Sequence, residues 1–263
     1  MLGAIIGDII GSPYETASHK RKDFTLFAPN CHPTDDGLMT IAVGCACVES
    51  DIRSEHSFKS ALDKYMKEIG LMYPNAGFGK RFYQWMALDE KEPYGSIANG
   101  SAMRVSPVAW AANTLEEAIQ FARWSAEITH NHPEGIRGAE AVAAAIFLAR
   151  TGADKKAIKA FIEQNYYTLN FTIDEIRPNY RFDLSCENSV PQAIVCYLES
   201  DSYEDAIRTA VSLGGDCDTL AAMAGSIAEA TFGIPEEITE QAFEFLDETL
   251  QDYYFSYADE LYR

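Results

Sequence analysis

Apolar residues recur at spacings of three and four along most of this chain, and this pattern constrains the fold more than any other feature. Such spacing places apolar side chains on one face of an α-helix. Strand-like alternation is scarce, and Tyr166–Phe171 is the one segment that suggests a strand. The sequence therefore predicts an all-α fold, with helices over Leu38–Glu49, Phe58–Gly70, Leu115–Ile128, Gly135–Arg150, Lys155–Asn165, Val190–Glu199, Tyr203–Leu213, Leu220–Phe232 and Glu236–Tyr253.

The 263 residues show no internal repeat, no low-complexity tract and no stretch with the composition of a linker. A chain of this length suits one large domain or two small ones. Helix ends are marked by Gly152, and by Gly233 with Pro235, which are ordinary helix stops. We therefore expect a single domain over residues 1–263.

Small residues form a stripe in the first predicted helix, where Gly3, Gly7 and Gly11 recur at every fourth position. Two later segments, Ala141–Ala145 and Leu220–Ala230, are also rich in alanine or glycine. Such stripes let helix backbones approach closely, and the same spacing drives dimers in membranes. Because these segments are too short and too polar for a bilayer, we expect tight packing of many helices.

The charge and the cysteine content indicate which classes of partner are unfavourable and which cell compartment is expected. Lys and Arg number 21 against 40 Asp and Glu, a formal net charge of −19, which repels nucleic-acid phosphates. A local basic pocket for one phosphorylated small molecule stays open, as does a need for cations beside clustered carboxylates. The longest apolar stretch, Met1–Ile10, contains Asp8, is too short for a membrane span and lacks the features of a signal peptide. The six cysteines show no metal-type spacing, so we expect free thiols, a cytoplasmic protein and no membrane partner.

Two predicted helices begin with an unusual density of acidic and hydroxyl side chains. Thr34, Asp35 and Asp36 precede one helix, and the run Gly214 to Thr219, with two aspartates, precedes another. Taken singly, each is explained by capping of free N–H groups and by the helix dipole. One cap per helix suffices, however, and adjacent carboxylates repel unless a cation lies between them. If the two starts converge, their roughly six hard oxygen ligands suit Mg²⁺ or Mn²⁺, as a two-cation centre.

Several other polar residues are candidates for either a structural or a functional role. Asp8 lies in an apolar helix and is expected to bond a neighbouring turn, whereas Glu15 is either an acid/base with a raised pKa or a surface residue. The Gly- and Ser-rich run from Tyr94 to Arg104 is either a cradle for phosphate or an ordinary loop. His130 and His132 lack a third soft ligand nearby, so neutral polar or capping roles are favoured.

In combination these residues resemble the ADP-ribosylglycohydrolases. Five segments match the family in order, and they cover nearly the whole chain: Gly3–Glu15, Thr34–Asp36, Asn99–Val105, Thr129–His130 and Asp216–Thr219. The resemblance implies an orthogonal all-α bundle with two divalent cations, Mg²⁺ or Mn²⁺, at the bottom of a cleft. It also implies hydrolysis of the bond between ADP-ribose and an acceptor, a protein side chain or a small molecule.

The resemblance further implies roles for individual residues. Glu15 is the candidate for acid/base work or substrate positioning, and Asp35 or Asp36 would help to activate water. The metal ligands would be Thr34, Asp35, Asp36, Asp216, Asp218 and Thr219, and the substrate-binding residues would be Gly95, Ser96, Asn99, Gly100, Ser101 and His130. The chain departs from the family at Cys217, whose side chain we expect to point away from the metals, and its short length leaves the acceptor open.

Two other functions are compatible with these residues. A catalytically silent ADP-ribose-binding protein could use the same fold, although the presence of Glu15 and all six ligand-type residues favours an enzyme. A two-metal phosphohydrolase would instead cut the diphosphate and release AMP and ribose phosphate. Analysis of the reaction products distinguishes this phosphohydrolase from a glycosidic-bond hydrolase, which would release intact ADP-ribose.

Overall fold

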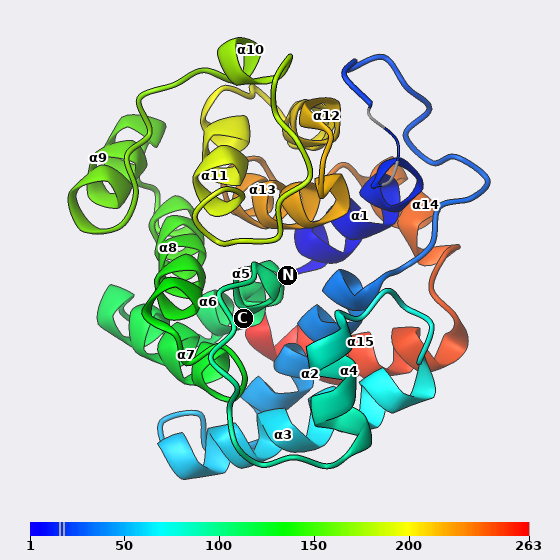
Figure 1. Ribbon diagram of the computed structural model, residues 1–263, viewed down its shortest axis with the longest axis vertical. Coiled ribbons are helices and arrows are strands. Elements are labelled where there is room, and N and C mark those ends of the chain that lie inside the picture. Colours follow the sequence, from blue (N-terminus) through cyan, green and yellow to red (C-terminus); the bar gives the residue numbers. More distant parts are fainter. Residues whose placement is uncertain (16, 18, 263) are drawn as a thin grey trace.

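The computed structural model describes residues 1–15, 17 and 19–262, and in this part of the chain all regular elements are helical (Figure 1). Ala98 and Ser185 form an isolated antiparallel bridge, without a strand on either side. The elements are α1 (Leu2–Gly11), the 3-10 helix η1 (Ser12–Tyr14), α2 (Asp35–Glu49), α3 (Glu55–Met72), α4 (Lys80–Ala87), α5 (Gly100–Met103), α6 (Ser106–Ala111), α7 (Leu115–Glu127), α8 (Pro133–Arg150), α9 (Lys155–Asn165), α10 (Ile173–Ile176), α11 (Val190–Leu198), α12 (Tyr203–Leu213), α13 (Cys217–Phe232), α14 (Glu236–Phe243) and α15 (Glu248–Leu261).

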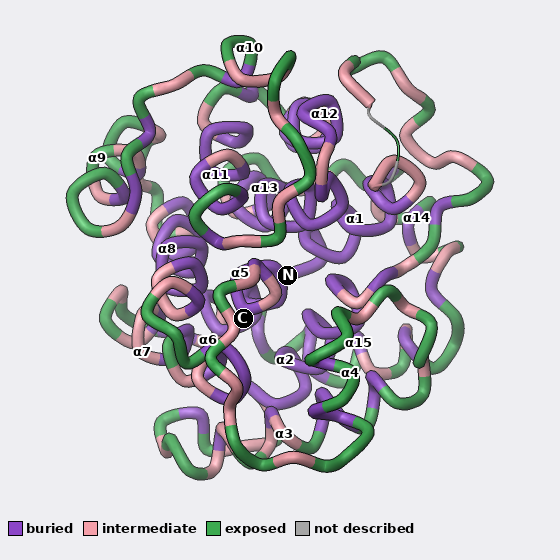
Figure 2. The backbone as a smooth tube through the Cα atoms, in the orientation of Figure 1, coloured by how far each residue is buried: buried purple, intermediate pink, exposed green. Residues whose placement is uncertain are grey.

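The centre of the fold is the pair α1 and α13, and Figure 2 shows both helices buried along most of their length. Their backbones touch along the glycine stripe. A Cβ atom on Gly3 would lie 2.5 Å from the Gly225 carbonyl oxygen, and one on Gly7 would lie 2.2 Å from that of Ala221. The stripe therefore holds two antiparallel helices at a separation that no larger residue permits, which confirms the tight packing expected from the sequence.

The other helices surround this pair in two groups. Helices α8, α11 and α12 contact α13, and α7 covers the outer side of α8. Helix α2 contacts α1, and α3, α6 and α15 pack against α2. As a result, the beginnings of α2 and α13 both lie beside the end of α1, at the junction of the two groups.

Most predicted helices are confirmed within three residues at each end, but two predictions are wrong. Glu236–Tyr253 is two helices, because Asp247 accepts a hydrogen bond from the backbone N–H of Leu250 (2.9 Å) and starts α15 afresh. The candidate strand Tyr166–Phe171 is irregular: Tyr167 and Leu169 are buried by side-chain packing, without a partner strand among the described residues. The short helices α4, α5 and α10 have no counterpart among the predicted helices.

The six cysteines are buried free thiols, as expected. Burial raises the pKa of all six thiols, which keeps them protonated, and they pack as small apolar side chains. Among the described residues, no helix combines the length and hydropathy needed to cross a bilayer.

Candidate metal centre and substrate cavity

The two acidic helix starts, separated by most of the sequence, meet in space. Thr34 is the N-terminal cap of α2, and Asp216 holds the same position on α13. The Thr219 hydroxyl donates a hydrogen bond to Oδ2 of Asp36 (3.1 Å), which joins the two starts directly. The convergence that the sequence alone left open is therefore present.

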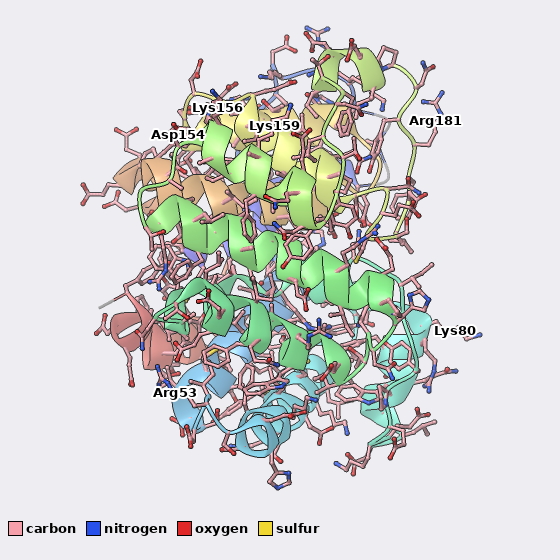
Figure 3. The ribbon with its side chains drawn as sticks, turned by 90° about the vertical axis from the view of Figure 1, so that its left-hand side faces the viewer. Arg53, Lys80, Asp154, Lys156, Lys159 and Arg181 are labelled. Atoms are coloured by element: carbon pink, nitrogen blue, oxygen red, sulfur yellow. The ribbon has the colours of Figure 1, made fainter. Side chains whose placement is uncertain are left out.

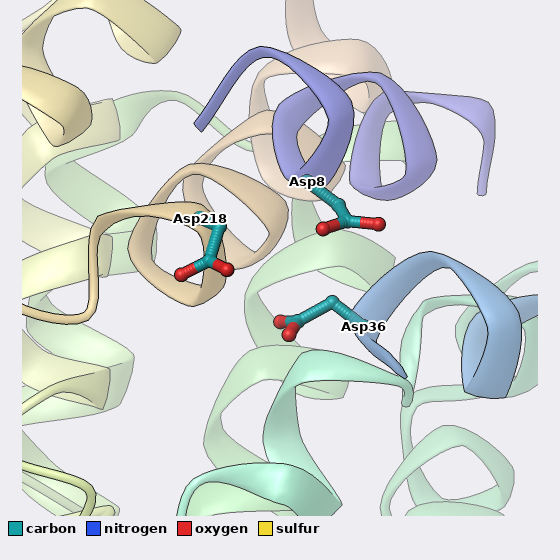
Figure 4. Close-up of side chains that lie close together, drawn as sticks. All are labelled: Asp8, Asp36 and Asp218. Atoms are coloured by element: carbon teal, nitrogen blue, oxygen red, sulfur yellow. The ribbon is translucent and has the colours of Figure 1, made fainter. Parts of the chain in front are cut away.

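Carboxylates from three helices point into the space between these starts. Figure 4 shows Asp8 from α1, Asp36 from α2 and Asp218 from α13 directed toward one another. One oxygen from each lies within 4.8 Å of the other two. Asp218 also belongs to a second group of the same dimensions, with Glu15 and Asp216. Two overlapping carboxylate groups that share one residue form a suitable frame for two neighbouring cations.

Asp8 ties the start of α2 to α1, in agreement with the structural role expected for it. Its Oδ2 accepts hydrogen bonds from the backbone N–H groups of Thr34 (2.8 Å) and Gly37 (2.9 Å), and its Oδ1 accepts one from the Thr34 hydroxyl (2.5 Å). These bonds orient the first turn of α2. The same carboxylate stays within reach of a cation through its place in the first group.

Burial and mutual repulsion raise the pKa values of these carboxyl groups. Burial, followed by the charges of Asp8 and Asp216, raises the pKa of Asp35 to about 8. Burial also raises the pKa of Asp216 to about 6, despite the hydrogen bond from Asn99. The pKa values of Asp36 and Asp218 lie well above the usual range, first through burial and then through neighbouring aspartates. Without a positive charge, this cluster holds protons at neutral pH.

The residues present fit divalent cations. Oδ1 of Asp36 is buried and has no hydrogen-bond partner, which is costly for a carboxylate oxygen. Among the described residues, no lysine or arginine forms an ion pair with any carboxylate of the two groups. Clustered carboxylate and hydroxyl oxygens are the ligands of hard cations such as Mg²⁺ and Mn²⁺.

The cluster forms the floor of a cavity of about 460 Å³, a volume typical of small-molecule sites. The six candidate ligands and Glu15 all line it. Of the expected substrate-binding residues, four line the wall: Ser96, Asn99, Gly100 and His130. Asn99 also donates a hydrogen bond from Nδ2 to Oδ2 of Asp216 (2.6 Å), which connects wall and floor.

Two expected substrate-binding residues do not line the cavity. Ser101 is fully buried, and its hydroxyl donates a hydrogen bond to the Gly135 carbonyl (2.7 Å). Gly95 is exposed on the loop, where its N–H donates to Oδ1 of Asn131 (2.8 Å). Their direct contact with substrate stays a prediction.

Cationic residues at the cavity are the feature that sequence reasoning missed. Lys80, Arg81 and Arg104 line the cavity, whereas the sequence left a local basic pocket open without assigning any lysine or arginine to it. In Figure 3, Lys80 and Arg181 project from the same side of the molecule. Only the Arg104 position lies in a segment that the sequence singled out. Lys80 and Arg81 begin the unpredicted helix α4, so no signal marked them.

The remaining candidates are placed as follows. His132 caps α8, since its Nδ1 accepts a hydrogen bond from the backbone N–H of Glu134 (3.1 Å), in line with the capping role considered for it. Sγ of Cys217 faces the Gly11 carbonyl at 3.7 Å, and Cys217 does not line the cavity. The thiol therefore points away from the carboxylates, as expected.

The fold and the site together are an all-helical bundle whose buried carboxylate cluster lines a cavity of small-molecule size. The ADP-ribosylglycohydrolase family model matches residues 1–263, and the chain belongs to that family. It is similar to human ADP-ribosylhydrolase ARH3, with 26% identity over 333 aligned positions that cover 95% of this chain and 89% of that protein. It is also similar to ADP-ribosylarginine hydrolase Tri1 of Pseudomonas putida, with 24% identity, 89% of this chain and 70% of that one.

A solved structure shares the fold. The structure titled ADP-ribosylglycohydrolase-related protein complex superimposes with a TM-score of 0.69 at 20% identity. The match covers all of this chain and 95% of the other. The predicted all-α fold of the family is thereby confirmed.

Proposed function

We propose that this protein is a metal-dependent hydrolase that cleaves the glycosidic bond between ADP-ribose and an acceptor. The observation that carries the proposal is the cavity, which joins both acidic helix starts on its floor to a polar and cationic wall. The relatives named ADP-ribosylhydrolases support the same reaction class. The acceptor is a side chain of an ADP-ribosylated protein or a small molecule.

Two divalent cations, Mg²⁺ or Mn²⁺, are the cofactors of this proposal. Their ligands would come from the six residues at the two helix starts: Thr34, Asp35, Asp36, Asp216, Asp218 and Thr219. When bound, such cations neutralise the carboxylates, orient ribose hydroxyls and lower the pKa of water. Asp8 would keep the first turn of α2 in place through its bonds to Thr34 and Gly37.

The wall of the cavity would hold the nucleotide part of the substrate. Ser96, Asn99, Gly100 and His130 line this wall and would contact the substrate, and Gly95 and Ser101 would shape the same loop. Lys80, Arg81 and Arg104 add positive charge on that wall, which favours a diphosphate. The carboxylate side of the cavity would thus bind the ribose through the cations, and the cationic wall would bind the diphosphate of the same ligand.

The chemistry requires help to the leaving group and an activated water molecule, because the bond breaks through an oxocarbenium-like state. Glu15 is half-buried beside Asp216 and Asp218, which supports a role as the acid/base or as a substrate-positioning residue. Asp35 or Asp36 would accept a proton from the attacking water. The bond from the ribose anomeric carbon to the acceptor breaks, water adds to that carbon, and the acceptor leaves with a proton.

The partners of this reaction are small or flexible groups rather than membranes or nucleic acids. The net charge of −19 disfavours general nucleic-acid binding. The six buried free thiols support a reducing compartment, and we propose the cytoplasm.

Calorimetric titration of ADP-ribose into the metal-stripped protein, and again with Mg²⁺ or Mn²⁺ restored, tests the proposal. We expect binding that depends on the cation, and release of intact ADP-ribose from an ADP-ribosylated substrate. AMP and ribose phosphate would indicate a phosphohydrolase, and binding without turnover would indicate a silent binding protein. Asp36→Asn should remove activity, whereas Asp174→Asn, at an exposed position on α10, is the matched control.

A further inference from the structure

A chain of three buried polar side chains runs along one wall of the cavity. Arg104, Thr129 and His130 are exposed by only 1%, 0% and 3%. Nη2 of Arg104 donates a hydrogen bond to the Thr129 hydroxyl (2.9 Å), and that hydroxyl lies 2.7 Å from Nδ1 of His130. Thr129 also holds the neighbouring loop, because its carbonyl accepts weak hydrogen bonds from the N–H groups of Tyr94 and Ser96 (3.4 Å each).

The direction of the hydrogen bonds in this chain follows from the donors available. A guanidinium group only donates, so the Thr129 oxygen accepts from Arg104 and keeps its own hydrogen for another partner. Among the described residues, Nδ1 of His130 is the acceptor within reach of that hydroxyl. If Nδ1 carried a proton instead, the hydroxyl hydrogen would be buried without a partner, at a cost of about 1–3 kcal/mol.

The charge state of the imidazole is fixed by the same surroundings. Burial, followed by the positive charge of Arg104, lowers the pKa of His130 well below its usual range. Burial lowers the pKa of Arg104 only to about 10, so its guanidinium stays protonated at neutral pH. His130 is therefore neutral, with one proton on one ring nitrogen.

We propose that Arg104 is a positioning residue that acts through the Thr129 hydroxyl to fix His130 as the Nε2–H tautomer. Nε2 lies on the side of Gly100, where a Cβ atom would be 3.2 Å away, and both residues line the cavity. His130 thus presents a neutral N–H donor for an oxygen atom of the bound ligand. That last step rests on the proposed function, whereas the tautomer itself does not.

Nitrogen-15 NMR of the histidine rings at pH 7 tests the tautomer without any ligand. The His130→Gln spectrum assigns the signal among the five histidines. We expect an unprotonated Nδ1 and a protonated Nε2 in the wild type, a mixture of tautomers in Thr129→Val, and the wild-type pattern in Thr129→Ser. A protonated Nδ1 in the wild type would overturn the proposal, and this measurement decides it even if a variant does not fold. An unchanged tautomer in folded Thr129→Val would overturn it too.

Calorimetry with ADP-ribose and Mg²⁺ tests the role of the donor. We expect roughly tenfold weaker binding by Thr129→Val, the loss of one neutral hydrogen bond, and nearly unchanged binding by Thr129→Ser. Equal affinity of Thr129→Val and wild type would show that the hydrogen-bonded chain Arg104–Thr129–His130 does not contribute to ligand binding. If wild-type protein does not bind ADP-ribose, the proposed function fails while the NMR result still decides the tautomer.

Discussion

One end of the α1–α13 pair buries a single carboxylate and the other end buries a cluster of them, and the two differ in their hydrogen-bond partners. At one end, Glu229 accepts hydrogen bonds from the Gly3 N–H (2.9 Å), the Tyr262 hydroxyl and the Met1 amino group. At the other end, Asp36 keeps a buried oxygen without a partner. Asp218 accepts a bond from the N–H of its neighbour Thr219 (2.9 Å) but faces other carboxylates.

The difference separates a carboxylate that is paired within the protein from carboxylates that are not. Buried acidic groups are stable when donors or positive charges surround them, and Glu229 meets this requirement within the chain itself. The Asp36 and Asp218 end has few such donors and no cationic side chain among the described residues, so its carboxyl groups either hold protons or need an added positive charge. One helix pair therefore has a carboxylate with its own donors at one end and, at the other, a carboxylate cluster without a counter-charge among the described residues.

The largest expected effect follows from replacing the acidic end. Asp218→Asn should reduce activity by about 10³-fold, because a cation contributes several kcal/mol to such a reaction. In EDTA at pH 8, the same variant should melt at a higher temperature than wild type, since the amide cannot ionise and so removes a group whose ionisation the folded state opposes. Steady-state rates and thermal melts check both effects. A lower melting temperature in EDTA would contradict our account of this end.

At the Glu229 end of the helix pair, we expect a loss of stability without a loss of activity. Glu229→Gln should destabilise the fold by about 3 kcal/mol, because it leaves a buried amino group without its counter-charge. Activity per folded molecule should stay unchanged. Urea denaturation measures the loss, with the exposed Glu260→Gln on α15 as control. Equal stability of the two variants would show that the carboxylate at this end is dispensable.

The contact between the two ends can be tested at the glycine stripe. Gly7→Ala should cost about 1–3 kcal/mol, since its Cβ atom would lie 2.2 Å from the Ala221 carbonyl oxygen and neither backbone can easily move. Gly79→Ala meets nothing within 4 Å and should change stability by less than about 1 kcal/mol. Chemical denaturation of both variants gives the comparison, and similar losses would argue against a tight helix contact.

The smallest effect concerns pH. The raised pKa values, about 6 for Asp8 and Asp216 and about 8 for Asp35, mean that the folded protein retains protons that the unfolded chain releases. Its metal-free stability is therefore highest below about pH 4 on this account and falls as pH rises toward 8. The gain in melting temperature from Mg²⁺ over EDTA should thus grow between pH 5 and pH 8, by a few degrees. If the gain in melting temperature from Mg²⁺ became smaller between pH 5 and pH 8, the predicted pH dependence would be wrong.

Much of the fold could be predicted because helical periodicity is a local property. Lys155–Asn165 and Tyr203–Leu213 have the bounds that the pattern predicts. Prediction failed where a tertiary contact or a cap overrides the pattern. The break between α14 and α15 depends on one capping residue, Asp247, within a segment whose apolar spacing continues across it.

The candidate site could be predicted in composition but not in arrangement. The density of acidic residues at Asp35 and Asp218 exceeds what capping needs, so the sequence itself marks them. That these starts meet depends on the packing of α1 against both helices, which no local pattern encodes. Arg104 could not be assigned either, because its role depends on the burial of Thr129 and His130 around it.

The glycine-lined contact between α1 and α13 also sets the order in which the protein can mature during synthesis. Roughly 180 residues separate Asp36 from Asp218, and at about 5–20 residues per second the ribosome needs about 10–40 s to add them. Throughout that interval the apolar face of α1 has no α13 to cover it. The buried carboxylate cluster can therefore assemble only after translation has passed the start of α13.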